Sequence, residues 1–164
     1  MTEEGGKGMS VRRAGPGDVR TVALFNRMLA EESEGVSLDP DVVEKGVAAQ
    51  LGDPARGRYY LAQRGGVIVG QLGLTTEWSD WRNGYFWWIQ SVFVRPEARR
   101  AGTFRRLYRA LEKEAAADGR CCGLRLYVEL QNRTAMDAYA SVGMQPTAYR
   151  IYEKDFTSIA APSP

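Results

Sequence analysis

The stretch between residues 85 and 130 constrains the fold most, because it alternates the patterns of a strand, a helix and a second strand. Residues 85–94 are apolar and β-rich and stop before Pro96, residues 103–117 show helical spacing, and residues 122–130 are again β-rich. Two neighbouring strands that are joined through a helix run parallel, and the crossover is right-handed. The sequence therefore predicts a parallel strand pair with a helix packed on one face of the sheet.

The segments before and after this unit predict antiparallel strands and further helices. Gly65-Gly66 separates two β-rich runs, residues 58–64 and 67–76, and a glycine pair at such a point favours a tight hairpin. The other expected elements are a strand at 9–13, helices at 18–32 and from Asp39-Pro40 onward, a loop at 77–84, a helix at 132–142 and a last strand at 147–152. The predicted order is β-α-α-β-β-β-α-β-α-β, which is an α/β class with a mixed central sheet and helices on both faces.

Length and composition fit one ordinary globular domain. The chain has 164 residues, of which 44% are hydrophobic and 26% charged. We expect the domain over residues 9–156, a loose tail at 157–164, and a polar, glycine-rich tail at 1–8 that lacks the apolar region of a secretory signal. No apolar run reaches membrane-spanning length, so we expect no membrane partner.

Charge and missing residue types exclude several classes of site. There is no histidine, which excludes a Ser-His-Asp or Cys-His apparatus, and the adjacent pair Cys121 and Cys122 suits neither a zinc site nor a disulfide. We therefore expect no metal, and a reducing cytoplasmic location. A nucleic-acid interface along the arginines of residues 95–109 is an alternative, but a net charge of only +2 argues against a nucleic-acid partner.

The loop Arg99-Arg100-Ala101-Gly102 has the features of an anion site. It joins the end of a strand to the start of a helix, where free backbone N–H groups and the positive end of the helix dipole meet. The two arginines add charge and forked donors, and Gly102 lets the backbone approach a ligand closely. A phosphate or pyrophosphate would suit this point. The alternative is an ordinary strand–turn–helix joint with a solvated basic loop.

Two motifs together resemble the GNAT superfamily of acyl-CoA-dependent N-acetyltransferases. Its loop signature is Gln or Arg, two residues, Gly, one residue, then Gly or Ala, and here Arg99 and Gly102 match while Phe104 departs from the small residue. The second motif is an Asn, an Ala, an aromatic residue and a Gly, which is similar to Asn132, Ala135, Tyr139 and Gly143. The resemblance covers residues 10–154, and the expected element order agrees with it.

By this resemblance, acetyl-CoA would bind between the strand that ends at residue 94 and the strand at residues 127–129. The implied cofactor-binding residues are Val92, Phe93, Val94, Arg99, Arg100, Ala101, Gly102, Thr103, Phe104, Asn132 and Tyr139. Backbone groups of Val92 and Val94 would pair with the pantetheine arm, and the loop N–H groups would hold the pyrophosphate. Tyr139 would give a proton to the departing thiolate. The structural alternatives are a plain helix N-cap for Asn132 and core packing for Tyr139.

The implied reaction moves an acetyl group from acetyl-CoA directly to a primary amine of a small molecule, peptide or protein. An amine is mostly protonated near pH 7, so a base or a water chain must remove a proton. Gln90 cannot be that base, and Glu129 is the first choice. Glu31, Glu32 and Asp80 are alternatives, and each carboxylate could instead be a solvated surface group. The same fold without catalysis, as an acyl-CoA sensor or subunit, is the alternative function.

All four tryptophans lie between residues 75 and 88, together with Tyr85. Such a cluster can form one wall of an acceptor pocket, because aromatic faces line apolar sites and hold cations. Trp87 and Trp88 are adjacent in a predicted strand and point to opposite faces, so at most one of them faces any given pocket. A homodimer interface explains the cluster equally well, since aromatic residues are enriched there.

Overall fold

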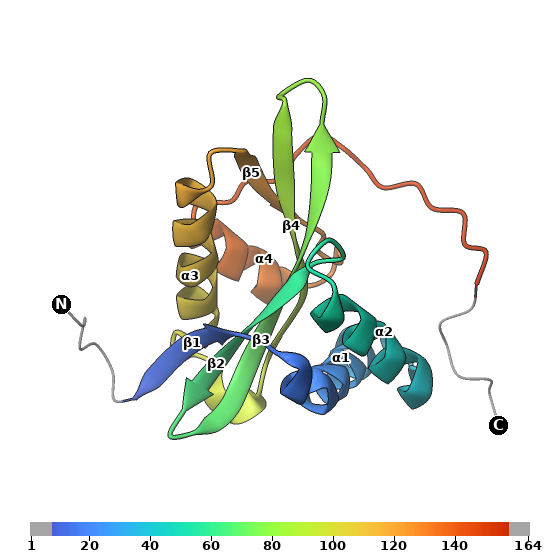
Figure 1. Ribbon diagram of the computed structural model, residues 1–164, viewed down its shortest axis with the longest axis vertical. Helices are drawn as coiled ribbons and strands as arrows, with labels where there is room; N and C mark the ends of the chain where they lie inside the picture. The colour runs from blue at the N-terminus through green and yellow to red at the C-terminus, as the bar shows by residue number, and fades with distance from the viewer. Residues whose placement is uncertain (1–7, 158–164) are drawn as a thin grey trace.

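A mixed β-sheet of five strands organises the part of the chain that the computed structural model describes, residues 8–157 (Figure 1). The elements in chain order are β1 (Met9–Arg13), a 3-10 turn (Pro16–Asp18), α1 (Val19–Glu34), α2 (Pro40–Gly52), β2 (Arg58–Arg64), β3 (Val67–Ser79), β4 (Gly84–Val94), a second 3-10 turn (Pro96–Ala98), α3 (Thr103–Ala117), β5 (Cys121–Leu126) and α4 (Arg133–Ala140). The α/β class with a mixed sheet is confirmed. The tails expected at 1–8 and 157–164 lie almost wholly outside the described residues.

The strands are ordered in space as they are in the sequence, β1-β2-β3-β4-β5. The first four pair antiparallel, and β4 pairs parallel to β5 through the α3 crossover, as predicted. Gly65 and Gly66 form the turn between β2 and β3, and both have positive φ angles, 58° and 79°. Glycine suits both positions because it has no Cβ that would oppose this conformation.

The hairpin of β3 and β4 is longer than expected, so the loop predicted at 77–84 is wrong. Glu77 pairs with Phe86 and Trp78 pairs with Tyr85, and the Trp78 and Tyr85 rings meet edge to face at 4.9 Å. Cross-strand aromatic pairs of this kind stabilise a hairpin beyond what residue type alone predicts. The turn closes at Asn83, whose φ is 48°. Figure 1 shows the hairpin projecting beyond the rest of the sheet.

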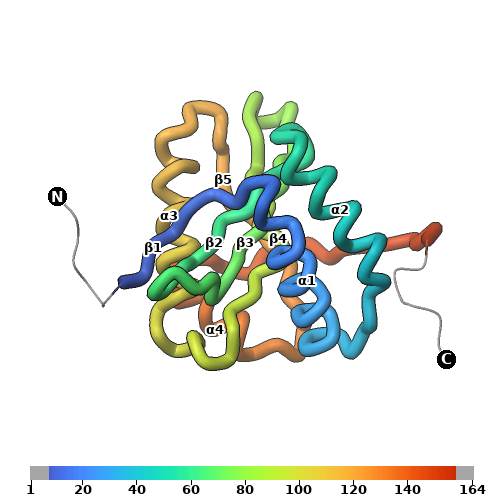
Figure 2. The backbone as a smooth tube through the Cα atoms, turned by 60° about the horizontal axis from the view of Figure 1, so that its bottom comes forward, coloured from blue at the N-terminus to red at the C-terminus, as the bar shows by residue number. Residues whose placement is uncertain are grey.

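The last predicted strand, at 147–152, does not form among the described residues, and β5 stops at Leu126 instead of Leu130. Tyr149 is 82% exposed and Tyr152 is 93% exposed. A strand needs a neighbouring edge to satisfy its backbone, and this segment runs away from the sheet without meeting one (Figures 1 and 2). The alternating pattern alone was therefore insufficient to predict a strand.

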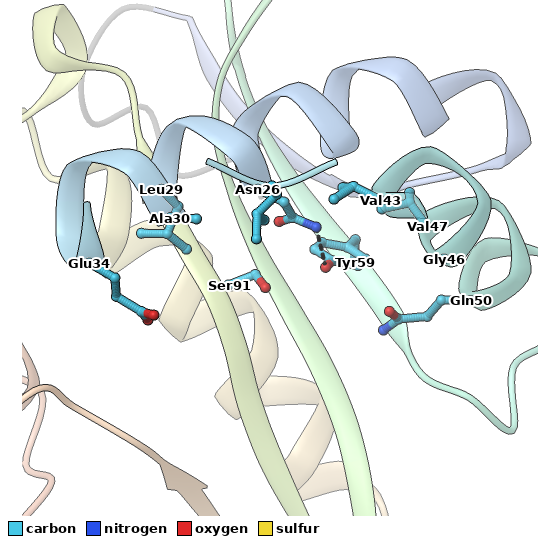
Figure 3. Close-up of a pocket in the computed structure, with 11 residues that line it drawn as sticks. Asn26, Leu29, Ala30, Glu34, Val43, Gly46, Val47, Gln50, Tyr59 and Ser91 are labelled. Carbon is cyan, nitrogen blue, oxygen red and sulfur yellow. Dashed lines mark hydrogen bonds between the residues drawn. The ribbon is translucent and has the colours of Figure 1, made fainter. Parts of the chain in front are cut away.

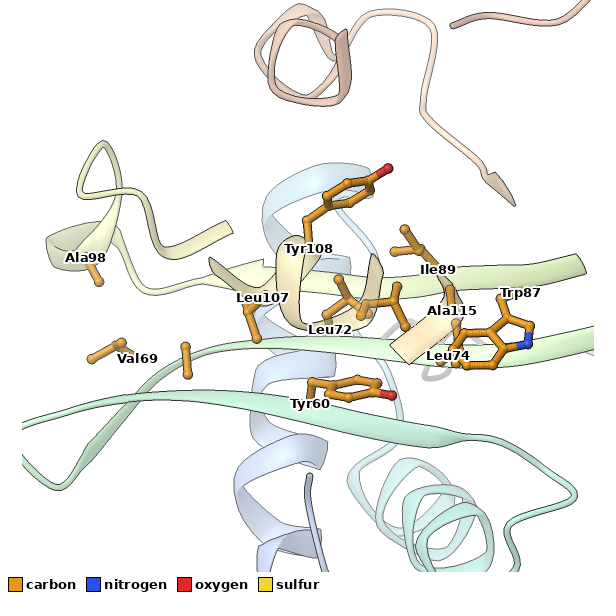
Figure 4. Packing of buried hydrophobic residues seen from close by; sticks show 12 residues of the cluster. Tyr60, Val69, Leu72, Leu74, Trp87, Ile89, Ala98, Leu107, Tyr108 and Ala115 are labelled. Atoms are coloured by element: carbon orange, nitrogen blue, oxygen red, sulfur yellow. The ribbon is translucent and has the colours of Figure 1, made fainter. Parts of the chain in front are cut away.

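The two faces of the sheet bury separate apolar clusters. On the α3 face, Leu107 and Leu111 pack on Tyr60, Leu72 and Ile89 (Figure 4). On the opposite face, a smaller cluster from α1, α2 and β2 is formed by Val22, Ala23, Val47, Tyr59 and Leu61. The strand period of two explains the division, because adjacent residues of β2 point to opposite faces.

Candidate active site

The opening between β4 and β5 is the first component of the candidate site. Their parallel pairing runs from Tyr85 opposite Cys121 to Ile89 opposite Leu126, and β5 ends there. β4 continues to Val94 and stays paired with β3 on its other side only. The backbone of residues 90–94 therefore has a hydrogen-bonding edge that no strand of the described chain covers. An extended ligand arm could pair with this edge as an added strand does.

A β-bulge at Ser91 bends β4 where the two strands separate. Gln71 pairs with Phe93 while Gly73 pairs with Gln90, so β4 carries one residue more than β3 over this interval. Ser91 itself has a φ of 47°, an unusual conformation for a residue with a side chain. Bulges turn a strand and redirect its side chains, and they are common beside active sites. Here the bulge keeps Phe93 against Phe25 of α1, at 4.9 Å between ring centres.

The loop before α3 presents backbone donors at the end of β4. Arg100 and Gly102 both have positive φ angles, 59° and 77°, and Gly102 is the N-cap of α3. No side chain caps this helix start, while the buried Thr103 hydroxyl donates to the Ala98 carbonyl at 2.8 Å and holds the loop closed. Left-handed residues of this kind turn successive N–H groups toward one point, which makes an anion-binding concavity. The predicted anion site thus has the expected local geometry.

Arg99 is engaged elsewhere in the fold. Its guanidinium donates to Glu32 of α1 at 2.7 Å and to the Val94 carbonyl at 2.9 Å. Arg99 therefore ties the loop to α1, and its forked donors are not directed at the anion site in this conformation. Arg100 is exposed in the same loop, and its role of adding charge to the anion site stays a prediction.

Asn132 is the N-cap of α4, and Tyr139 lies near the end of that helix. The Asn132 Oδ1 accepts from the Ala135 N–H at 3.0 Å, so the N-cap role is confirmed, and its amide nitrogen is the group that could contact a cofactor. Tyr139 is half-buried, and its ring contacts Phe104 at 5.5 Å. Burial raises the pKa of Tyr139, which keeps the phenol protonated at neutral pH as a proton donor requires. Phe104, the departure from the loop signature, packs against Tyr108 and Tyr139.

A cavity of about 430 Å³ lies on the other face of the sheet, beneath α1 and α2 (Figure 3). Its walls are mostly apolar, and Ser91 at the bulge forms part of its floor. The apolar lining comes from Leu29, Ala30, Leu38, Val43 and Val47. Because Ser91 belongs to β4 at the point where the strands part, this cavity is next to the opening. It has the size and character of a small-molecule site.

Polar residues that sequence reasoning missed line this cavity or support it. Asn26 and Tyr59 line it, and Asn26 donates to the Tyr59 oxygen at 3.1 Å. Gln71 lies behind them, fully buried, and its amide nitrogen donates to Asn26 at 2.7 Å and to the Ser91 carbonyl at 3.2 Å. A glutamine in the otherwise apolar run of β3 was the available signal, because polar side chains are rarely buried without a partner.

The carboxylate that lines the cavity is not one of the predicted bases. Glu34, the last residue of α1, lines the cavity, because α1 extends two residues beyond the helix predicted at 18–32. Glu129 lies three residues beyond β5, exposed, and its carboxylate accepts from the Gln131 N–H at 2.7 Å. Glu32 pairs with Arg99, and Asp80 lies at the hairpin turn and accepts from the Trp81 N–H. None of these last three carboxylates lines the cavity.

The tryptophans are also absent from the residues that line the cavity. Trp87 is buried in the α3-face core, Trp88 packs against Tyr127 at 4.6 Å, and Trp81 is 92% exposed on the hairpin turn. Trp88 also donates to Glu77, which pairs with Arg125. The cluster therefore shapes the hairpin and its neighbours, its predicted role as an acceptor wall stays a prediction, and the cavity described above is lined mainly by residues of α1 and α2.

Comparison with known proteins decides the family. The profile of the Acetyltransferase (GNAT) family matches residues 23–144, which span the opening, the loop and α4. The chain belongs to this family. GNAT enzymes transfer acyl groups from acyl-CoA to amine acceptors, so the chain is an acyltransferase.

Solved structures agree with the GNAT assignment. A possible acetyltransferase from Clostridium difficile 630 is 41% identical, with a TM-score of 0.85, over 93% of this chain and 100% of that one. Two GNAT folds solved with ligands are each 15% identical with TM-scores of 0.73. The aminoglycoside N-acetyltransferase AAC(6')-Iy with CoA covers 96% of this chain and 100% of that one. A predicted acetyltransferase from Clostridium acetobutylicum with acetyl-CoA covers 89% and 96%. No curated protein sequence compared with the chain matches it significantly.

Two further properties concern the described residues alone. They contain no cluster of three or more His, Cys, Asp or Glu side chains that could hold a metal ion. Within residues 8–157, no helix combines the length and apolar character that crossing a membrane requires.

Proposed function

We propose that this GNAT enzyme transfers an acetyl group from acetyl-CoA to a primary amine that binds in the cavity beneath α1 and α2. The observation that carries the proposal is the juxtaposition at the Ser91 bulge. On one side of the bulge lies the uncovered edge of β4, and on the other lies the cavity of about 430 Å³, which can hold a small amine. A thioester carbonyl held along that edge would meet an amine from the cavity at the bulge. Such positioning is a major source of rate enhancement.

The residues that suit the cofactor are those of β4, the loop and α4. Edge groups of Val92, Phe93 and Val94 would pair with the pantetheine arm, and the N–H groups from Arg100 to Phe104 would hold the pyrophosphate. The Asn132 amide nitrogen would donate to the arm. These donors are present without a competing cap, which is the fit that the ligand requires.

Proton transfer can be divided between the two sides of the bulge. A backbone N–H near Val92 would stabilise the negative charge that develops on the carbonyl oxygen. Tyr139, kept protonated by burial, would give its proton to the departing thiolate. The proton of the incoming amine would pass, directly or through water, to a carboxylate. Glu129 is the predicted base, and Glu34 is the carboxylate that the structure places in the cavity wall.

Amine-dependent release of free CoA thiol from acetyl-CoA tests this proposal. We expect release with a panel of apolar primary amines, and a loss of about tenfold or more in kcat for Glu34→Gln or Glu129→Gln, whichever carboxylate is the base. Asp137→Asn, an exposed change on α4, is the matched control. Tight acetyl-CoA binding without amine-dependent release would favour the alternative, an acyl-CoA sensor or subunit.

The setting and assembly belong to the same proposal. The free cysteines Cys121 and Cys122 fit a reducing cytoplasm. We further propose a homodimer in which residues 147–152 of one copy cover the β5 edge of the other, because that segment exposes Tyr149, Ile151 and Tyr152 and β5 ends the sheet. Light scattering should give twice the chain mass, and truncation before residue 147 should give the monomer. A monomeric full chain would contradict the dimer but not the transferase.

A further inference from the structure

The hydrogen bonds beneath the cavity have one fixed direction, set by the carbonyl of Ser91. A backbone carbonyl oxygen can only accept, so the Gln71 side-chain atom that lies 3.2 Å from it must be the amide nitrogen. Turning this amide over would bring two oxygens together. Gln71 therefore donates both to Ser91 and to the Asn26 Oδ1, while its own oxygen is buried without a hydrogen-bond partner.

The donor-to-acceptor direction of these hydrogen bonds continues from Gln71 through Asn26 to Tyr59. Since the Asn26 oxygen accepts from Gln71, the other side of its amide is the nitrogen, which donates to the Tyr59 oxygen at 3.1 Å. The Tyr59 hydroxyl thus acts as an acceptor toward Asn26, and its own hydrogen must point elsewhere. No hydrogen-bond acceptor for that hydrogen is found in the part of the chain that the structure describes, residues 8–157. Tyr59 lines the cavity (Figure 3), so the cavity is where this donor is available.

The charges around the cavity limit which substrate groups can accept a hydrogen bond from Tyr59. Among the described residues that line it, none is cationic, and Glu34 is anionic. A carboxylate on the acceptor amine would therefore have no cationic side chain to pair with and would be repelled by Glu34. An uncharged oxygen, such as a hydroxyl or an amide carbonyl, can accept from Tyr59 without that cost. The apolar walls suit a hydrocarbon body on the same molecule.

We propose that Tyr59 selects acceptor amines that carry a neutral oxygen, that is, apolar amino alcohols and amino amides in preference to plain alkylamines and amino acids. This inference rests on the proposed function. Tyr59 is only 3% exposed, so an amine without the oxygen would leave its hydroxyl hydrogen buried without an acceptor. Sites built to hydrogen-bond a substrate group discriminate strongly against analogues that lack it.

Three matched amines test the inference by thiol release from acetyl-CoA. Leucinol has the oxygen, 1,3-dimethylbutylamine replaces its hydroxymethyl group with methyl, and leucine replaces it with a carboxylate. We expect kcat/KM for leucinol to exceed that for 1,3-dimethylbutylamine by about tenfold, mainly through KM, and leucine to be the poorest. Tyr59→Phe should reduce the leucinol preference to about one. Tyr60→Phe, the same change at the neighbouring residue on the opposite face, should keep it.

The outcomes separate the inference from the function on which it rests. If no amine releases thiol, both the proposed function and the Tyr59 inference fail. If amines release thiol but leucinol has no advantage in the wild-type enzyme, or keeps its advantage in a folded Tyr59→Phe variant, only the inference fails. Should Tyr59→Phe not fold, the wild-type ratio decides: about tenfold supports the inference, and a ratio near one overturns it.

Discussion

On the α3 face of the sheet, a large apolar cluster packs between strands and helix, with the Tyr60 hydroxyl donating to Glu114 of α3 at 2.6 Å, whereas the α1–α2 face keeps a chain of polar side chains beside a cavity of about 430 Å³. Tight packing against α3 gives the stability that a fold of this size needs. On the opposite face the apolar cluster is smaller, and α1 is held at its start by Arg12–Asp18 and at its end by Glu32–Arg99. The comparison favours a mainly structural role for the α3 face, while the proposed function assigns the acceptor amine to the α1–α2 face.

Truncation of one leucine on each face should show the largest difference. Leu111 is fully buried on the α3 face, and Leu111→Ala should cost about 3 kcal/mol in the free energy of unfolding, because it leaves a void in a packed core. Leu29 already borders the α1–α2 cavity, so Leu29→Ala should cost about 1 kcal/mol. Denaturant unfolding measures both. Equal costs would contradict the division between the faces.

Replacing Tyr139 tests whether a residue of α4, which packs against α3, takes part in the reaction. Tyr139→Phe should lower kcat by about tenfold or more, because the thiolate loses its proton donor, while acetyl-CoA affinity and unfolding free energy change little. Since burial raises the pKa of this phenol, the wild-type kcat should not fall on its account until the pH exceeds the ordinary tyrosine value of about 10.

Two results would remove Tyr139 from the mechanism. Unchanged kcat in Tyr139→Phe would leave the residue with a packing role against Phe104 only. A large loss of stability with proportionate loss of activity would place it in the core. Tyr85→Phe is the matched control, since that ring packs on Trp78 in the projecting hairpin.

The smallest expected effect concerns the polar anchor at the start of α1. Arg12 donates two hydrogen bonds of 2.8 Å to Asp18 and thereby lowers the pKa of that carboxyl, against the opposing effect of its burial. Asp18→Asn should cost about 1 kcal/mol in unfolding free energy at pH 7. A carboxyl with a lowered folded-state pKa stabilises above its unfolded pKa of 3.8 and loses that contribution as the pH falls through the folded value.

The wild-type and Asp18→Asn proteins should therefore converge in stability as the pH falls below 3.8 and through the lowered folded-state pKa of Asp18. The asparagine oxygen can still accept from the Gly15 N–H and from one Arg12 N–H, but its amide nitrogen replaces the oxygen that accepts the second Arg12 hydrogen bond, so the variant removes the charge together with that one bond. A difference that persists unchanged in acid would show that the ion pair is not what holds this end of α1.

Much of the fold was predictable from local patterns. The apolar spacing of residues 103–117 and the β-rich runs on either side were sufficient for the parallel crossover, because chain connectivity leaves one common arrangement. The longer hairpin was not, since it depends on the contact of Trp78 with Tyr85 across the strands. The strand predicted at 147–152 was wrong, because a strand must also pair with a neighbouring strand, and a sequence pattern does not show whether one is within reach.

The cofactor side of the candidate site was also more predictable than the acceptor side. The loop from Arg99 to Phe104 is contiguous in sequence, so its turn chemistry was visible there. Asn26, Tyr59 and Gln71 come from three elements, and only the folded sheet brings them together. Their proposed role depends on the orientation of the Gln71 and Asn26 amides. The Ser91 carbonyl at the bulge sets that orientation, because it can accept only from the Gln71 nitrogen.

Isothermal titration of acetyl-CoA, with ATP and CoA as comparisons, tests the central claim most directly, namely that the opening between β4 and β5 holds an acyl-CoA. We expect acetyl-CoA to bind at least tenfold more tightly than ATP, because the uncovered β4 edge recognises the pantetheine arm that ATP lacks, with CoA close to acetyl-CoA. Equal binding of ATP would reduce the site to a phosphate-binding loop. No heat from acetyl-CoA at millimolar concentration would contradict the account.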